Sequence, residues 1–147
     1  MTHGMDTSFL VALEIAEHAQ RPNVRATLTR IIADGDRLAI APPVLAEFVH
    51  IVTDAKRFER PLAMHDALEH SQRWWNAAEV DRVFPTDGAI SLFHEWMNTH
   101  RLGRKRVLDT MLAATYRTAG ITSLLTLNPD DFSVFHQFSC VTIAAAK

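Results

Sequence analysis

Short, almost wholly apolar runs alternate along the chain with longer segments in which apolar residues recur every three or four positions. Recurrence at that spacing is typical of amphipathic helices, whereas the short apolar runs are typical of buried strands. We predict helices at residues 7–20, 23–36, 42–52, 61–75, 88–100 and 107–120. We predict strands in a very short segment before Asp6 and at residues 37–41, 79–85, 121–127 and 140–144.

Proline, glycine and capping residues mark several of these helix ends. Pro42-Pro43 opens one helix, because a proline in the first turn lacks only an N–H that would be unpaired there. Thr86 or Asp87 is suited to cap the helix that follows it. Gly35 and Gly120 stop two others.

Strands that are short, apolar and separated by helices indicate a parallel sheet covered by helices on both faces. Most of the connections contain two predicted helices, so we expect an α-rich α/β sandwich. The 147-residue length, without a repeat or flexible linker, predicts a single domain over residues 1–147.

Charge and cysteine content narrow the picture only slightly. The formal net charge of −2 gives no overall signal for nucleic acid, so any basic patch has to be local. The single cysteine, Cys140, excludes an intrachain disulfide and is expected to be a buried small apolar residue. We find no signal peptide and no apolar run long enough to cross a membrane, and we expect a cytoplasmic protein.

Acidic residues occur where functional sites form in open α/β sheets, beyond the carboxyl ends of the strands. Asp6 and Asp131 follow predicted strands, Glu47 lies one turn into a helix, and Asp109 lies near the first turn of another. An isolated acid at a helix start is more often a structural cap, worth about 0.5–2 kcal/mol. Glu47 is harder to explain structurally, because its apolar neighbours suggest that it needs a partner or a metal ion.

The segment "NPDD" at residues 128–131 is typical of a helix start, with Asn128 as cap and Pro129 in the first turn. Asp130 and Asp131 would then both lie in that turn, about 100° apart around the axis. Geometry alone leaves open which of them has a function.

Four segments together resemble the PIN-domain ribonucleases of the VapC toxin type: "MDTSFLVAL", "PPVLAEFVHIV", "GRKRVLDTMLAATYRTAG" and "LLTLNPDDF". The resemblance implies a three-layer α/β/α sandwich, an acidic pocket that holds Mg²⁺ or Mn²⁺, and hydrolysis of RNA. The acidic cluster of that family corresponds here to Asp6, Glu47, Asp109 and Asp131. Asp131 is selected over Asp130 because it directly precedes Phe132. The supporting polar positions of the family correspond to Ser8, Thr126 and Asn128.

Within this cluster we expect Asp6 and Asp109 to be the principal metal ligands, with Glu47 and Asp131 assisting. The basic residues just before Asp109, namely Arg104, Lys105 and Arg106, are candidates to hold the RNA backbone, although a solvated loop is an equally good interpretation. The resemblance also implies a homodimer and a protein antitoxin that blocks the acidic pocket.

Two other classes of function remain as alternatives. A receiver-like regulatory domain also uses aspartates at strand ends, but it needs a lysine after its last strand, where this chain offers only Lys147. A non-catalytic RNA-binding module would keep the fold without cleaving. A di-iron site is excluded because it needs two Glu-x-x-His pairs, and only Glu47 and His50 form one.

Overall fold

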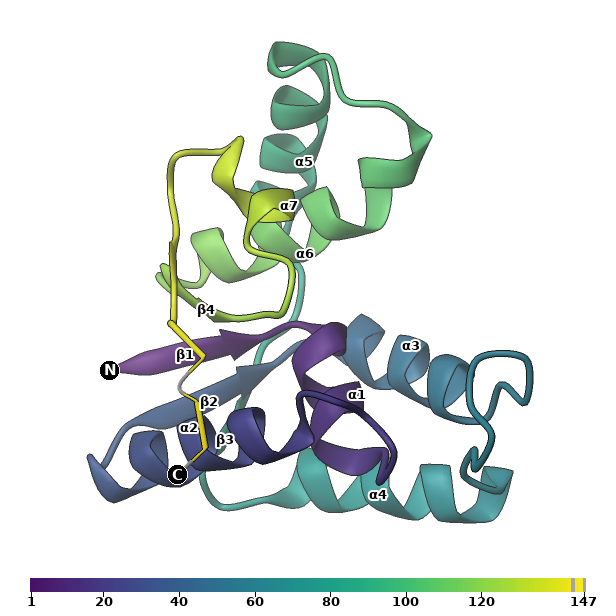
Figure 1. Cartoon of the computed structure of the whole chain (residues 1–147). Helices are drawn as coiled ribbons and strands as arrows, with labels where there is room; N and C mark the ends of the chain where they lie inside the picture. Colours follow the sequence, from purple (N-terminus) through teal and green to yellow (C-terminus); the bar gives the residue numbers. More distant parts are fainter. Residues whose placement is uncertain (144, 147) are drawn as a thin grey trace.

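The computed structural model describes residues 1–143 and 145–146 of the chain (Figure 1). Its strands are β1 (Thr2–Met5), β2 (Arg37–Ile40), β3 (Val80–Arg82), β4 (Ser123–Leu125) and β5 (Ser139–Cys140). Its helices are α1 (Thr7–Glu14), α2 (Arg21–Ala33), α3 (Pro42–Val52), α4 (Met64–Asn76), α5 (Asp87–Thr99), η1 (Arg104–Arg106, a 3₁₀ turn), α6 (Val107–Thr118) and α7 (Asp130–Ser133). This alternation of strands with helices was predicted from the sequence.

All five strands are parallel and lie in the order β3-β2-β1-β4-β5. The chain runs outward from the central strand β1 in one direction, through β2 and β3, and then returns to β4 on the other side of β1. Receiver domains have the order 2-1-3-4-5, so the receiver-like alternative is wrong for this chain. The point where the strand order reverses lies between β1 and β4.

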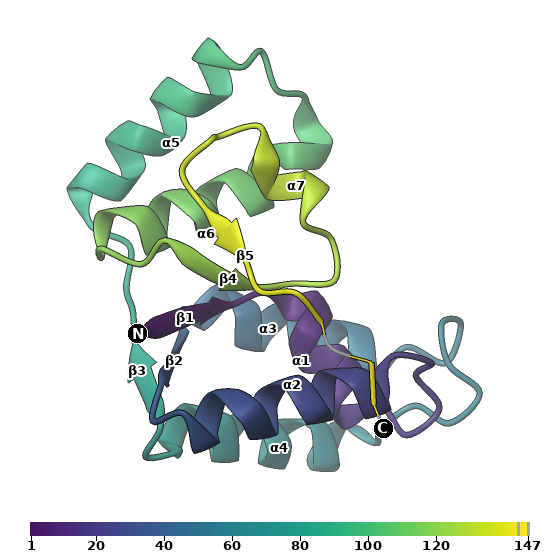
Figure 2. The same ribbon diagram turned by 60° about the vertical axis from the view of Figure 1, so that its left-hand side comes forward.

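Helices cover both faces of this sheet. Figures 1 and 2 show α1, α2, α3 and α4 on one face and α5, α6 and α7 on the other. The expected three-layer α/β/α sandwich is therefore confirmed. Within the described residues no helix has the length and apolar character that a membrane span requires.

Tyr116 of α6 fixes the distance between that helix and the centre of the sheet. Its fully buried ring lies against Gly4 of β1, where an added Cβ would be 2.8 Å from the Tyr116 Cδ2. Its hydroxyl donates to the carbonyl oxygens of Met5, at 2.6 Å, and Ala39, at 3.2 Å. The ring thus holds α6, and Asp109 on it, above the ends of β1 and β2.

Several predicted boundaries are wrong, including those of the strands expected at 79–85 and 121–127, each of which covers only three residues. The first helix ends at Glu14, because Ile15 is extended and fully buried in the core. The helix predicted from Pro61 begins at Met64, since the Leu62 N–H donates to the Val52 carbonyl and Ala63 is extended. The last strand covers only Ser139–Cys140 instead of 140–144, after which Val141 makes one more bond to β4. Residue 144 lies outside the described residues.

Candidate active site and metal centre

Asp6 lies at the carboxyl end of the central strand, at the point where the strand order reverses. Its backbone N–H donates to the carbonyl of Leu125 at the end of β4, at 3.0 Å. Asp6 is also the residue that caps α1. Strand end, sheet switch point and helix start therefore coincide at one carboxylate, which is 7% exposed.

Hydrogen bonds hold both oxygens of the Asp6 carboxylate. Oδ1 accepts from the Thr7 backbone N–H at 2.8 Å. Oδ2 accepts from the Ser8 hydroxyl at 3.0 Å and from the Thr126 hydroxyl at 2.7 Å. Two of the three predicted supporting residues thus contact Asp6, and the third, Asn128, donates its backbone N–H to Thr126 Oγ1 at 3.0 Å.

The four acids predicted from the sequence come together around one cavity of about 440 Å³. They reach it from four different elements: Asp6 after β1, Glu47 on α3, Asp109 on α6 and Asp131 on α7. Ser8 and Asn128 also line this cavity, which we call the carboxylate cavity. Asp130, the neighbour that geometry alone did not exclude, is exposed and does not line it.

Burial and mutual repulsion make it unfavourable for these acids to be charged together. Burial raises the pKa of Asp6 and the nearby charge of Asp131 raises it further, while hydrogen bonds from Thr126, Ser8 and Thr7 partly offset this. Burial and the charge of Asp6 raise the pKa of Glu47. These groups are thus held close together without enough positive charge to balance them.

The carboxyl of Asp109 is affected by all three of the other acids. Its pKa is raised to about 6, first by burial and then by the charges of Asp6, Asp131 and Glu47, against a smaller opposing effect of Arg106. Its carboxylate makes no hydrogen bond to another described residue. An uncompensated cluster of carboxylate oxygens is the donor set that Mg²⁺ and Mn²⁺ prefer, so the residues present fit a divalent cation.

A different group has its ligand atoms close enough to share a metal ion. His65, Asp66 and Glu69 on α4 bring their ligand atoms within 4.8 Å of one another, but all three are exposed. They do not line the carboxylate cavity, around which the four acids lie. Exposed acidic side chains on one helix turn need no metal, and we assign no site to them.

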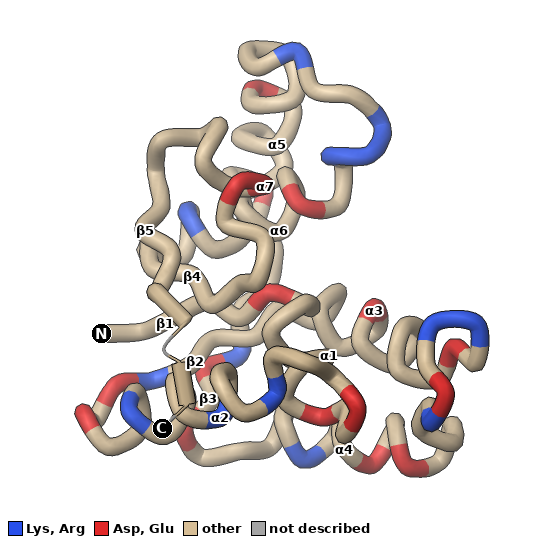
Figure 3. Tube along the Cα trace, viewed as in Figure 1, with Lys and Arg blue, Asp and Glu red and all other residues tan. Residues whose placement is uncertain are grey.

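Basic residues occur in two loops on the right-hand side of Figure 3, one between α3 and α4 and one between α5 and α6. Arg57, in the first loop, lines the carboxylate cavity and lowers the pKa of Glu47. No periodic pattern in the sequence shows that this loop folds back to the site. His18 and Phe58 also line this cavity and were missed for the same reason.

The predicted basic triplet has two kinds of member. Arg104 and Lys105 are exposed in the 3₁₀ turn. Arg106 is partly buried, and its guanidinium donates to the backbone carbonyl of Asp131. Its Nε atom is buried without a partner within the described residues. Arg106 therefore ties the start of α6 to the segment that presents Asp131.

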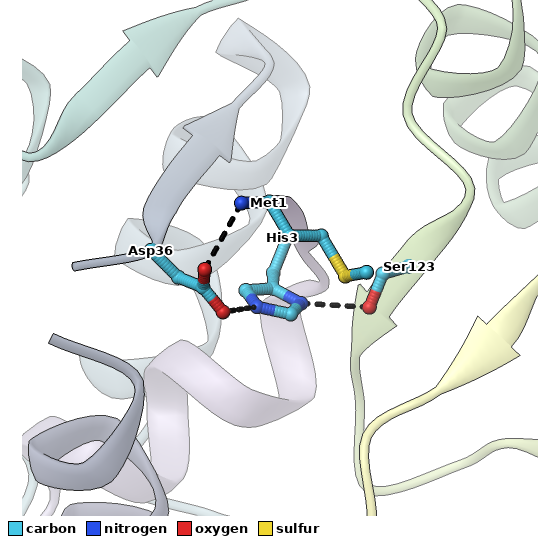
Figure 4. Close-up of polar contacts among 4 residues, drawn as sticks. All are labelled: Met1, His3, Asp36 and Ser123. Atoms are coloured by element: carbon cyan, nitrogen blue, oxygen red, sulfur yellow. Dashed lines mark hydrogen bonds and ion pairs between the residues drawn. The ribbon is translucent and has the colours of Figure 1, made fainter. Parts of the chain in front are cut away.

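A second polar network crosses the opposite end of the sheet (Figure 4). His3 Nε2 lies 2.9 Å from Asp36 Oδ2, and His3 Nδ1 lies 2.7 Å from Ser123 Oγ. The amino group of Met1 also donates to Asp36, at 2.9 Å. Ser123, His3 and Asp36 form a chain of side-chain contacts. His3 and Ser123 are buried, however, and do not line the carboxylate cavity. The network connects the starts of β1, β2 and β4.

Comparison with solved structures supports the fold. The toxin VapC20 of Mycobacterium tuberculosis, described as cleaving the sarcin-ricin loop, superposes with a TM-score of 0.69 at 20% identity, covering 90% of this chain and 94% of that one. VapBC-1 from nontypeable Haemophilus influenzae gives 0.67 at 17% identity, with 96% and 97% covered. VapBC2 from Rickettsia felis, bound to a DNA fragment from its promoter, gives 0.65 at 16% identity, with 96% and 98% covered.

Comparison with curated protein sequences finds no match. The sequence model of the PIN domain, in contrast, matches residues 5–136, which include β1 to α7 apart from the first residues of β1. All four acids of the carboxylate cavity fall inside that match. This chain belongs to the PIN domain family.

Proposed function

We propose that this chain is a metal-dependent endoribonuclease that acts as the toxin of a toxin–antitoxin pair. The observation that carries the proposal is the convergence of Asp6, Glu47, Asp109 and Asp131 on one cavity. Three of these acids have raised pKa values to which another member of the cluster contributes. Such a cluster favours a bound cation over the empty, fully ionised site.

In this proposal Asp6 and Asp109 are the principal ligands of Mg²⁺ or Mn²⁺, and Glu47 and Asp131 assist directly or through water. When bound, a divalent cation acidifies a water molecule and neutralises negative charge that develops on a phosphodiester. Ser8 and Thr126 fix the Asp6 carboxylate through their hydroxyl groups. Their role is to fix the orientation of the Asp6 carboxylate beside the other acids that would hold the ion.

The basic side chains have separate roles. Arg57 lines the carboxylate cavity and is suited to contact the phosphate next to the one that is cleaved. Arg104 and Lys105, exposed in the loop before α6, are suited to hold the RNA backbone farther from the cut. Arg106 acts mainly inside the protein, because its guanidinium contacts the Asp131 backbone.

The partners follow from the structural neighbours, two of which are toxin–antitoxin complexes. We propose a protein antitoxin for this chain and a homodimer as its assembly. Leu68 and Trp75 are outer apolar residues that line a shallow groove between α3 and α4, together with Pro42 and Leu45. They are suited to the contact between the two copies of the homodimer. Cellular RNA as substrate implies action in the cytoplasm.

The test is to incubate the purified protein with total cellular RNA and Mg²⁺ or Mn²⁺, and to map new RNA ends. We expect discrete cuts that disappear with EDTA and in Asp109→Asn. Asp131→Asn and Asp130→Asn form a matched pair of adjacent acids, and only the first should lose activity. Cleavage that survives Asp109→Asn contradicts the proposal. RNA binding without cleavage, with or without metal, would favour the non-catalytic alternative.

A further inference from the structure

A second cavity, of about 360 Å³, adjoins the carboxylate cavity. Asp6, Glu47 and Asp109 line both, so these acids form the wall between them. The rest of the second cavity is formed mainly by α3 and α6, through Pro43, Val44, Ala46, His50, Leu108, Met111, Leu112 and Thr115. Whatever occupies it lies directly beside the proposed metal ligands. We call it the side cavity.

The side cavity is apolar apart from the shared acids and few other groups. Leu108 lines it although this side chain is 70% exposed, and Met111 lies one helical turn farther along α6. A single exposed leucine is ordinary on a protein surface. Here it stands immediately before Asp109 and on the wall of a cavity that reaches the acids. An apolar cavity with a few polar groups beside acids of raised pKa is typical of a ligand site.

His50 supplies the side cavity with a polar group that the protein itself does not use. Its imidazole is exposed and makes no hydrogen bond to another described residue. It lies near enough to Glu47 to lower the pKa of that carboxyl. A ring nitrogen in this position is available to bond the edge of a ligand.

We infer that the side cavity binds one nucleobase of the RNA, next to the phosphodiester that is cleaved. This inference rests on the proposed function. A base has two flat apolar faces and a polar edge, and proteins that read single-stranded RNA stack the faces and bond the edge. Pro43, Leu108 and Met111 suit the faces, and His50 suits the edge.

The shared wall favours a nucleotide over the apolar side chain of a protein partner. A phosphate held beside Asp6 and Asp109 would carry its base on the attached ribose, next to the adjoining cavity that the same acids line. The base and phosphate of one nucleotide therefore match the apolar and acidic halves of the site together. Arg57 on the carboxylate cavity adds positive charge suited to the same polyanion.

One experiment compares ligands that differ only in the base. Methyl signals of Leu108 and Met111 are followed by NMR while nucleoside 5′-monophosphates, or ribose 5-phosphate as the base-free control, are added with Mg²⁺. We expect at least one nucleotide, and not ribose 5-phosphate, to shift these signals. The methyl groups of Ile90, which is 42% exposed on α5 and lines neither cavity, should not shift.

A matched pair of variants locates the effect. Leu108→Ala should weaken nucleotide binding about 5-fold or more, as expected for partial loss of one stacked base, and leave ribose 5-phosphate unaffected. Ile90→Ala removes another exposed aliphatic side chain, outside both cavities, and should change neither. Equal responses to nucleotides and ribose 5-phosphate, or unchanged binding in Leu108→Ala, would overturn the inference. Cavity signals that respond only to a bound protein partner would assign the cavity to that partner instead.

A second experiment uses an RNA that the protein cleaves, prepared in two forms. Each form has one abasic residue, on one side of the cut or on the other. We expect one of the two positions to lower kcat/KM about 10- to 100-fold, with a smaller penalty in Leu108→Ala. No penalty at either position contradicts the inference while leaving the nuclease intact. If no RNA is cleaved but nucleotides still bind as described, the proposed function fails and the side cavity remains a nucleotide site.

Discussion

The two ends of the sheet treat carboxylates in opposite ways. At the carboxyl end, Asp109 faces other acids, and its pKa is raised to about 6. At the amino end, Asp36 faces the His3 ring and the amino group of Met1, which hold its pKa below the usual range. Both ends use polar side chains to connect β1 with its neighbours. Only the first leaves negative charge without a partner.

This difference separates a binding site from a structural network. A network that serves the fold reaches its lowest free energy with the groups already present, so adding an ion gains little. A cluster of repelling acids is less stable than the same cluster with a cation. The direction of a carboxyl pKa therefore distinguishes the two ends more clearly than the kinds of residue present, since both contain Asp, Ser and a further polar partner.

The largest expected difference between the two ends of the sheet is the change in metal affinity when a hydroxyl group is removed. Thr126→Val removes the 2.7 Å bond to Asp6, and we expect metal affinity to fall about 10- to 100-fold, as for other residues that orient a ligand. Ser123→Ala removes the bond to His3 and should leave metal affinity within about 2-fold. Calorimetric titration with Mn²⁺ measures the metal affinity of both variants. Equal losses would mean that the two ends are not functionally distinct.

Opposite changes in thermal stability are expected when each end loses one charge. In metal-free protein at pH 7, Asp109→Asn relieves repulsion and should raise Tm by about 2–4 °C. Asp36→Asn removes a favourable charge and should lower Tm. Excess Mg²⁺ should raise the Tm of the wild type and of Asp36→Asn, but not of Asp109→Asn. Calorimetric or fluorescence melting tests this, and a lower Tm for metal-free Asp109→Asn would contradict it.

The smallest effect is the pH dependence that Asp109 contributes. Because its pKa is raised to about 6 in the folded protein, the folded state binds more protons than the unfolded state between pH 4 and pH 6 or so. Its contribution to the free energy of unfolding therefore falls as pH rises through this window. The pKa of Asp36 is lowered in the folded protein. Asp36 therefore contributes stability at pH values above the pKa that it has in the unfolded chain, and this contribution is lost only in more acidic solution.

Melting metal-free wild type and Asp109→Asn from pH 4.5 to 7.5 isolates this contribution. The Tm gain of the variant over the wild type should be small at pH 4.5 and grow toward pH 7.5. Titrating groups that do not interact with Asp109 affect both proteins alike and cancel in the difference. A gain that does not change with pH would show that repulsion at Asp109 is not its cause.

The sequence predicted the acids of the carboxylate cavity better than the residues around them. Asp6 directly follows β1, and Asp131 lies on α7, the short helix that comes after β4. The carboxyl ends of two adjacent parallel strands therefore bring these acids to the same edge of the sheet. The resemblance, more than geometry, selected Asp131 over Asp130, and the structure places only Asp131 on the carboxylate cavity.

Residues outside regular elements were harder to predict. Arg57 reaches the carboxylate cavity through a turn in which the Lys56 N–H donates to Asp54 Oδ1 at 2.8 Å, a local bond with no periodic signature. The basic letters of "RKR" did not reveal that Arg106 turns inward to the Asp131 backbone. Nor did the pattern show that Leu108, on a helix whose other apolar residues are mostly buried, lines an open cavity.

The central position of β1 has a consequence for synthesis. Asp6 is made well before its partner Thr126, which lies 120 positions later in the chain. At about 5–20 residues per second, several seconds of translation separate the two. Until β4 leaves the ribosome, β1 has one unpaired side and Asp6 lacks its shortest hydrogen bond. A nascent chain therefore carries its acids without an assembled site, and competence arises only when nearly the whole PIN domain is free to fold.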